Sequence, residues 1–295
     1  MIWIILLISL FLPIHSWAGF SVSGVTDPAN VAGVVEPASV AGVESAYGCT
    51  GYNCGFAEDP NCKALWRFDD DALTTDSVGT NTFTNDGVDE ELVDYREGDG
   101  CGEWVAINTD YMYRTDANWV GPWKSDDAVK TGSVCAWVKF ASRPDVEDLF
   151  GIFTKYNNTA GKRSFAATLE HYSSGIMYAK LILGYNNGDS FEAIYHASNL
   201  SLDTWYHITW TYQNSDKAYA IRVRDVDGNV VGTDKTGTAT LDANKLNVED
   251  VQVEIGSVIG ATVWCFDGLI DELAVFDDII TADEATQIAK GIYGQ

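Results

Sequence analysis

Short segments in which apolar and polar residues alternate follow one another from Ala64 to Phe276. This alternation is typical of β-strands, whose successive side chains point to opposite faces of a sheet. It predicts strands at residues 65–68, 103–108, 133–140, 149–156, 164–171, 176–185, 191–196, 205–212, 218–224, 230–234, 251–258 and 268–276. Turn sequences such as Asp227-Gly228-Asn229 separate them. Since no amphipathic helix lies between the strands, the pattern predicts an all-β sandwich or barrel.

One helix is predicted, at the C-terminal end of the chain. Thr281 and Glu284 have the spacing of a capping box, in which each side chain accepts a hydrogen bond from the backbone N–H of the other residue. The helix should cover residues 282–290. Gly291 follows, and a glycine at that place favours the left-handed backbone conformation that ends many helices.

The predicted strand at residues 205–212 carries large aromatic residues on both faces. Alternation places Trp205 and His207 on one face and Trp210 on the other, which indicates a sheet covered on both sides. We interpret these two tryptophans, together with Trp137, as core anchors. His207 could act as a general base or metal ligand, but a hydrogen-bonded core histidine is the commoner role.

Four segments occur in the order in which laminin-G-like (LamG) domains carry them. They are Ala64-Leu65-Trp66-Arg67-Phe68-Asp69, Gly132-Ser133-Val134-Cys135-Ala136-Trp137-Val138-Lys139, the Trp205-Tyr206-His207 signature, and Gly268-Leu269-Ile270-Asp271-Glu272 with its helix. In these segments the chain resembles LamG domains of the concanavalin A-like lectin/glucanase superfamily. The resemblance implies a concanavalin A-like jelly-roll β-sandwich with a short C-terminal helix. It covers residues 64–292 of a domain expected at residues 49–295.

The resemblance also implies a structural calcium ion between the first and last strands. Asp69 and Asp271 are then the expected ligands, with backbone carbonyl groups completing the shell. Alternation puts Asp271 and Glu272 on opposite faces of the last strand, where a buried carboxylate needs a partner. The alternative is that Asp69 and Asp271 cap turns or pair with Arg67.

The N-terminal part of the chain differs from the rest. Residues 1–18 are mostly apolar and end in Ser16-Trp17-Ala18, so we interpret them as a cleaved signal peptide. No second long apolar run follows, so we expect a secreted or cell-surface protein without membrane insertion after cleavage. Residues 19–48 repeat a Val-x-Gly-Val unit every nine residues, with Pro28 and Pro37 between the copies. This indicates an extended spacer or, alternatively, a segment for self-assembly by strand addition to another subunit.

The chain has 43 acidic and 18 basic side chains, which gives a net charge of −25 at pH 7. Such a surface repels phosphate groups and argues against nucleic acid and anionic membranes as partners. It attracts divalent cations, which is compatible with calcium, although solubility alone would also explain it.

Six cysteines remain after the signal peptide: Cys49, Cys54, Cys62, Cys101, Cys135 and Cys265. An even number behind an export signal indicates disulfide bonds, whose pairing the sequence leaves open. We expect two of the first three cysteines to pair locally, and Cys135 and Cys265 to bridge across the sheet. Zinc is the alternative, but the spacing of the first three is too wide for a Cys-x-x-Cys unit.

Catalytic motifs are absent from the sequence. Jelly-roll glycosidases carry a Glu-x-Asp-x-Glu strand that points their carboxylates into one cleft, and this chain lacks that triplet. A Gly-x-Ser-x-Gly nucleophile motif is absent as well. We therefore expect no enzyme activity, with a glycoside hydrolase or lyase as the least favoured alternative.

Aromatic residues in an expected loop are the candidates for ligand binding. Tyr111, Tyr113, Trp119 and Trp123 lie between predicted strands, among polar neighbours. Aromatic faces stack on the C–H surfaces of sugars, while polar neighbours bond the hydroxyl groups. The two tryptophans have an alternative role as a small core of their own loop. Tyr156-Asn157-Asn158 offers a further rim or simply a turn.

These observations predict a non-catalytic recognition module that binds an extracellular glycan or a surface protein through rim loops. The second hypothesis is a structural subunit of an extracellular appendage, fibre or adhesin. In that case residues 19–48 would join neighbouring subunits.

Overall fold

The computed structural model describes residues 55–173, 175–185, 187, 189–241, 246–258 and 264–293. The chain divides into two units, Met1–Val43 and Glu44–Gln295, and all described residues belong to the second. The predicted signal peptide and spacer, together with Cys49 and Cys54, lie outside them. Neither described α-helix has the length and apolar character needed to cross a membrane.

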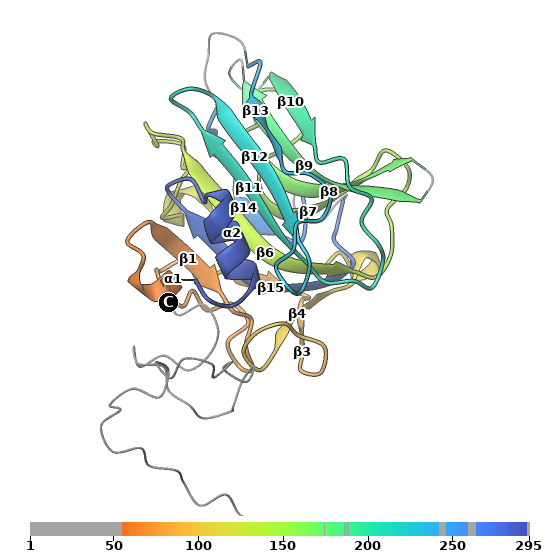
Figure 1. Cartoon of the computed structure of the whole chain (residues 1–295). Coiled ribbons are helices and arrows are strands. Elements are labelled where there is room, and N and C mark those ends of the chain that lie inside the picture. The colour runs from red at the N-terminus through yellow and green to blue at the C-terminus, as the bar shows by residue number, and fades with distance from the viewer. Residues whose placement is uncertain are drawn as a thin grey trace, which may run out of the picture. The chain divides into compact units, whose positions relative to one another are not determined.

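The described residues form two antiparallel sheets (Figure 1). Sheet A has the order β13 (Lys235–Thr238), β12 (Ala218–Arg224), β11 (Tyr206–Gln213), β6 (Gly132–Phe140), β15 (Gly268–Phe276), β4 (Cys101–Trp104) and β3 (Asp89–Glu91), and β1 (Cys62–Trp66) also pairs with β15. Sheet B has the order β10 (Ser190–Tyr195), β9 (Ile176–Tyr185), β8 (Phe165–Ser173), β7 (Leu149–Lys155), β14 (Val253–Ile255), β5 (Tyr111–Arg114) and β2 (Thr84–Asp86). The α-helices are α1 (Gly55–Glu58) and α2 (Ala282–Ala289), and short 3-10 helices occupy Ala106–Asn108 and Asp116–Asn118. This arrangement confirms the predicted all-β sandwich with a short C-terminal helix.

The sheets pack face to face because alternate apolar side chains of their strands point inward. On β11, Ile208 and Trp210 belong to the main core. Trp205 and His207 lie on the other side of the strand and are buried too, so the prediction of a sheet covered on both faces is confirmed. The predicted hydrogen bond of His207 is wrong, because neither ring nitrogen has a partner among the described residues.

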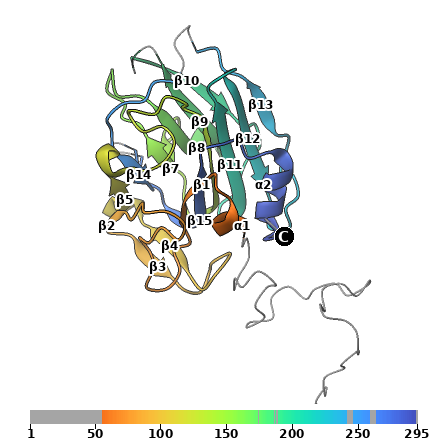
Figure 2. The same ribbon diagram turned by 90° about the vertical axis from the view of Figure 1, so that its left-hand side faces the viewer.

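The helix α2 covers the outer face of sheet A, on the side away from sheet B (Figure 2). Its buried residues Ala285 and Ile288 pack against apolar side chains of β1 and β15. The predicted capping box is formed: Thr281 Oγ1 accepts from Glu284 N at 3.2 Å, and Glu284 Oε2 accepts from Thr281 N at 2.8 Å. Gly291 follows the helix with a φ of 68°, the left-handed conformation that the sequence predicted.

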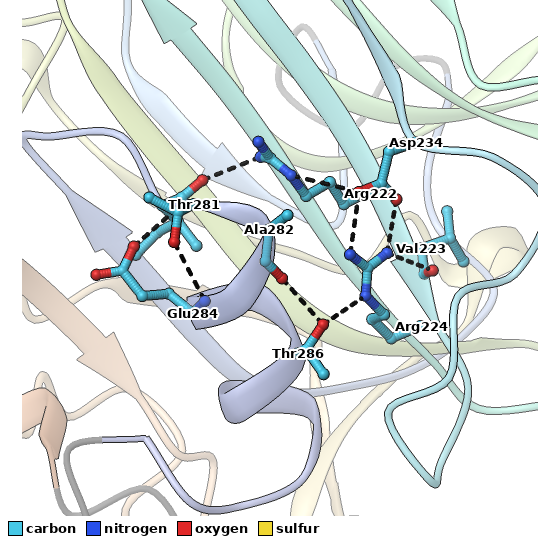
Figure 3. A network of polar contacts seen from close by, with 9 residues as sticks. Arg222, Val223, Arg224, Asp234, Thr281, Ala282, Glu284 and Thr286 are labelled. Carbon is cyan, nitrogen blue, oxygen red and sulfur yellow. Dashed lines mark hydrogen bonds and ion pairs between the residues drawn. The ribbon is translucent and has the colours of Figure 1, made fainter.

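Two arginines of β12 tie α2 and the loop before it to sheet A (Figure 3). Arg224 donates from Nε to Thr286 Oγ1 at 3.0 Å. Its Nη1 and Nη2 donate to the two carboxylate oxygens of Asp234 at 2.7 and 3.0 Å. Arg222 donates from Nη1 to the carbonyl oxygen of Ile280 at 3.0 Å. The cover over sheet A is therefore fixed by polar contacts as well as by apolar packing.

The strands from β6 to β12, and β15, follow the predicted ranges closely, whereas other segments depart from them. The first predicted strand, at residues 65–68, is shifted to β1, and the predicted range 103–108 contains only the end of β4 before a 3-10 helix. Residues 230–234 form no strand because Gly232 has a φ of 75°, and β13 begins at Lys235. Gly256, with a φ of 83°, ends β14 after Ile255. The aromatic segment expected to be a loop contains β5, which pairs with β14 and β2.

The expected bridge between Cys135 and Cys265 is absent, so that prediction was wrong. Cys135 is a fully buried free thiol on the outer face of sheet A, where it packs with Cys62 and Leu65. Cys265 lies near sheet B, where burial and the carboxylate of Glu254 raise its pKa to about 11. The two thiols therefore belong to different layers of the sandwich.

Candidate ligand-binding site

Tyr111 and Tyr113 share the outer face of sheet B. Met112 between them is buried in the core, so alternation turns both rings away from it. Their centroids lie 5.4 Å apart and their planes differ by 22°, which is a stacked arrangement. Both side chains are partly exposed. The structure thus brings two of the four predicted ligand-binding residues together at the surface, on a strand instead of a loop.

A depression of 440 Å³, which we call the sheet B depression, opens on the same side of the strand pair β14–β5. Glu254, the cross-strand partner of Tyr113, contributes to its wall. The other lining residues are Tyr156, Asn157, Thr159, Lys162, Asp250, Val251 and Gln252. The lining is therefore mostly polar, with one aromatic residue, and the stacked tyrosine pair lies beside it.

Within the sheet B depression, Glu254 orients Gln252. The Glu254 side chain is almost fully buried, and its Oε1 accepts a hydrogen bond of 2.6 Å from Gln252 Nε2. Its Oε2 accepts from Ser257 Oγ. These bonds fix the amide of Gln252, whose Oε1 accepts from no donor among the described residues. A fixed amide with a free acceptor can receive a hydroxyl hydrogen from a ligand.

The phenol groups of Tyr111 and Tyr156 stay protonated at neutral pH. Burial raises the pKa of Tyr156. Burial, followed by the neighbouring carboxylates of Asp86 and Glu254, raises the pKa of Tyr111. Protonated phenols can both donate and accept hydrogen bonds, which matches the hydroxyl groups of a polyol ligand.

A buried ion pair fixes the turn that follows β5. Lys155 Nζ lies 2.8 Å from Asp116 Oδ1, and both side chains are almost wholly buried. Burial alone would raise the pKa of Asp116, but hydrogen bonds from Lys155 and Ser125 hold it below its usual range. Arg114 further bonds the carbonyl oxygens of Thr82 and Asn118. The tyrosine pair therefore stands on a rigid strand that is anchored at its end.

Trp119 and Trp123 are fully buried, so the expectation that they are exposed loop residues was wrong. The ring of Trp123 stacks on Phe165 at 3.8 Å between centroids, and Trp119 stacks on Trp66 at 6.4 Å. Both belong to the main core, because the chain turns inward after β5 and fills the end of the sandwich. Their burial agrees with the alternative of a packing role, although the core is that of the whole domain.

A second group of tyrosines lies at the other end of sheet B. The ring of Tyr172, which is 51% exposed, lies 5.3 Å from that of Tyr178 and 5.9 Å from that of Tyr195. Lys180 Nζ sits 5.1 Å above the ring of Tyr195 and forms a buried ion pair with Glu170. We use this group below as a matched comparison.

Asp271 and Glu272, expected on opposite faces of β15, lie at an irregular point of that strand. Pairing with β6 is shifted by a bulge between Asp271 and Ala274, and Glu272 has a φ of 45°. A bulge breaks the strict alternation of side chains. Burial, and then the charges of Glu272 and Asp271, raise the pKa of Glu97. The prediction of opposite faces assumed a regular strand, and β15 is not regular at these two residues.

The two predicted calcium ligands make other contacts. Asp271 Oδ2 accepts from the backbone N–H groups of Arg96 and Glu97 at 2.7 and 3.0 Å. Asp69 Oδ1 accepts from the backbone N–H of Asp99 at 3.1 Å. These are the turn-capping contacts of the alternative hypothesis, and it is Glu272 that pairs with Arg67, at 2.6 Å.

The described residues contain one group of three acidic, histidine or cysteine side chains close enough to share an ion. It consists of Asp70, Asp71 and Glu90, all exposed, and includes neither Asp69 nor Asp271. Calcium at Asp69 and Asp271 therefore stays a prediction.

Sequence reasoning missed the residues that form the depression. Gln252 and Glu254 lie in a predicted strand, at alternate positions among apolar residues. That pattern could have placed both on the outer face of the sheet. Tyr156 was noted only as part of a rim or turn, and the position of that turn beside β14 depends on the pairing of β7 with β14.

The chain was compared with known families and structures. The laminin G model described as "Concanavalin A-like lectin/glucanases superfamily" matches residues 114–286, from the end of β5 to α2. The chain belongs to this superfamily. This confirms the resemblance that the sequence suggested, and the two antiparallel sheets have the concanavalin A-like jelly-roll architecture. No curated protein matches the sequence of this superfamily member.

Solved structures of similar fold include carbohydrate-related and receptor-binding domains. Domain 4 of AbnA, an extracellular arabinanase from Geobacillus stearothermophilus solved in complex with arabinotriose, superposes with a TM-score of 0.52. The match covers 78% of this chain and 98% of that domain, at 15% identity. The receptor binding domain of botulinum neurotoxin type G has a TM-score of 0.53 over 78% of this chain and 51% of its own, at 14% identity. At these identities the likeness establishes the fold alone.

Proposed function

We propose that this domain binds an extracellular glycan in the sheet B depression without transforming it. The observation that carries the proposal is the stacked pair Tyr111–Tyr113 beside a polar depression of 440 Å³. Membership of a superfamily of lectins and glucanases supports a sugar as the ligand. The similar domain of the arabinanase, solved with arabinotriose, supports it further.

The chemistry of the site matches a sugar better than a charged ligand. The ring of Tyr113 offers an apolar face for the C–H surface of a pyranose or furanose. Gln252, Asn157 and Thr159 supply polar groups for hydroxyls. Among the charged lining residues, Lys162 and Asp250 carry opposite charges, and the carboxylate of Glu254 is already hydrogen-bonded by Gln252 and Ser257, so the depression attracts no strong anion.

The non-catalytic and extracellular parts of the proposal have separate support. The chain lacks the Glu-x-Asp-x-Glu triplet, and both oxygens of the buried carboxylate in the depression, that of Glu254, already accept hydrogen bonds. Residues 1–18 have the features of a signal peptide, and the arabinanase with the similar domain is extracellular. We therefore infer that the module lies outside the cell, where it binds a glycan and retains it.

A glycan array with the labelled mature protein tests the proposal. We expect retention on a subset of glycans, weakened about tenfold by Tyr113→Ala or Gln252→Ala, since each replacement removes one stacking or hydrogen-bonding contact. Tyr172→Ala is the matched control, because it removes an exposed tyrosine from the other end of sheet B. Equal losses in Tyr113→Ala and Tyr172→Ala, or retention on no glycan, would contradict the proposal. Release of shortened products would contradict the non-catalytic part.

Calcium enters the proposal as a stabilising ion rather than as a ligand contact. If Asp271 holds the ion, calcium should raise the melting temperature of the wild type, and a chelator should reverse the effect. The Asp271→Asn variant should then melt at the same temperature with calcium and with chelator. A wild-type melting temperature that calcium does not change would remove the ion from the proposal.

A further inference from the structure

A second hollow, which we call the sheet A hollow, lies on sheet A beside the loop that leads into α2. Its volume is 230 Å³, and Ile279 forms one of its walls. Ala220 of β12 lies in its floor, directly between Thr211 of β11 and Thr236 of β13. The hollow exists because β12 presents the small residues Ala218 and Ala220 here. It is separate from the sheet B depression, which lies on the other sheet.

Arg222, which lines the sheet A hollow, is only 9% exposed and keeps part of its hydrogen-bonding capacity unused. Its Nη1 donates to Ile280, but Nε is 3.6 Å from Asp234 Oδ2, too far for a hydrogen bond. Nε has no hydrogen-bond partner among the described residues. Thr211, 2% exposed, also lines the hollow, so its hydroxyl is a second donor there.

Buried donors without acceptors are rare in folded proteins, because each loses its hydrogen bonds to water. An acceptor supplied by a ligand in the hollow would satisfy the Nε–H of Arg222, and it can also accept from the hydroxyl of Thr211. Arg222 needs acceptor atoms next to its positive charge, and a carboxylate supplies them.

The charges around Arg222 balance one another. They belong to Arg224, Asp234 and Glu284. Arg224 takes both carboxylate oxygens of Asp234, and Glu284 is held in the capping box of α2 (Figure 3). Two guanidinium groups therefore face two carboxylates, and both carboxylates are already held by hydrogen bonds within the protein. In a chain with a net charge of −25, a locally balanced group of charges repels an anion less than the rest of the surface does.

We propose that the sheet A hollow binds the carboxylate of an acidic sugar residue, with Arg222 and Thr211 as donors and the alanines of β12 beneath the ring. Ile279 and Ala220 provide apolar contacts for the C–H groups of the ring. The hollow is a second ligand site, independent of the proposed glycan site on sheet B.

Calorimetric titration with glucuronate tests this site, with glucose and acetate as comparison probes. Glucuronate should bind at a single site, whereas glucose lacks the carboxylate and acetate lacks the ring. Ala220→Val should abolish binding because it fills the floor. Thr211→Val, of almost equal shape, should weaken binding about tenfold. Thr238→Val, on β13 outside the hollow, is the matched control and should bind as the wild type.

Arg222→Gln gives a less direct test, because Arg222 also holds the loop before α2. Its result counts only where the melting temperature matches that of the wild type. Glucose binding as tightly as glucuronate would overturn the carboxylate assignment, and acetate binding as tightly would overturn the sugar assignment. Loss of glucuronate binding in Tyr113→Ala, but not in Ala220→Val, would place the ligand on sheet B and overturn the site. The glycan-array result with Tyr113→Ala tests the site on sheet B and does not decide whether the sheet A hollow binds glucuronate.

Discussion

The outer faces of the two sheets arise from the same alternation of side chains, yet that of sheet A is covered and that of sheet B is open. On sheet A, α2 and the loop between β3 and β4 cover polar residues such as His207 and Asp271, which are wholly buried. On sheet B, Tyr113 and Tyr172 remain partly or largely exposed. The covered face holds ionisable groups whose pKa values are displaced. The open face holds aromatic and polar groups that can reach a ligand.

This difference shows that the residues that can contact a ligand and the buried ionisable residues lie on different sheets of this domain. Burial lowers the pKa of His207 to about 3 and raises that of Glu272 to about 7. Displaced values of this kind often mark functional sites. Here the groups with displaced pKa values lie beneath a helix and a loop. On sheet A these displacements therefore reflect the loss of hydration of a polar face that is covered.

The largest expected effect is a difference in unfolding free energy between variants of the buried tryptophans and variants of the exposed tyrosines, which belong to one continuous segment. Trp123→Ala should lower the free energy of unfolding by about 3 to 5 kcal/mol, because it removes a ring stacked on Phe165 and leaves a cavity. Tyr113→Ala, on the open face, should change it by about 1 kcal/mol or less. Urea denaturation of both variants measures the contrast. Equal destabilisation would show that the two halves of the segment are packed alike.

That segment also shows what the sequence can and cannot reveal. Tyr111, Tyr113, Trp119 and Trp123 are aromatic residues in similar polar surroundings, so composition gave them one role. Their burial differs because β5 pairs with β14 and β2 and the chain then turns inward. Pairing between distant segments decided the outcome, and local alternation contains no information on it.

Regular strands and the helix cap were predictable because their signals are local. The range predicted for β9 agrees with the structure at both ends, and Thr281 and Glu284 form the expected capping box. The bulge at Glu272 was not predictable, since it depends on how β15 aligns with β6. The depression beside Gln252 was missed for a similar reason, because it needs the turn after β7 to lie next to β14.

The next effect concerns the buried acids of sheet A. The Glu272 carboxyl has an ordinary pKa of 4.5 that burial raises to about 7 in the folded chain, despite the opposing charge of Arg67. Between these values the folded chain binds more protons at this group than the unfolded chain does. Stability from this group is therefore complete below pH 4.5 and is lost as the pH rises through about 7.

The Glu272→Gln variant, which cannot ionise, should lack this part of the pH dependence. The difference between wild type and variant should change by up to about 3 kcal/mol between about pH 5 and about pH 8. Urea denaturation at both pH values measures it. His207 contributes a slope of opposite sign below its ordinary pKa, but it does so in both proteins and cancels in the difference. Exposed Glu90→Gln is the control, and an equal pH response in that variant would contradict the assignment to buried carboxyls.

The smallest effect tests how the cover of sheet A is held in place. Thr281→Ala removes the hydroxyl that accepts from Glu284 N and should cost about 1 kcal/mol of unfolding free energy. Thr281→Ser keeps the hydroxyl and should be close to neutral. Because α2 is also tied to β12 through Thr286 and Arg224, we expect the helix to stay docked in Thr281→Ala, with near-ultraviolet circular dichroism unchanged. A loss of that signal would mean that α2 undocks without its cap. The outer face of sheet A would then be exposed like that of sheet B, and the contacts of Arg224 would not be enough to hold the helix.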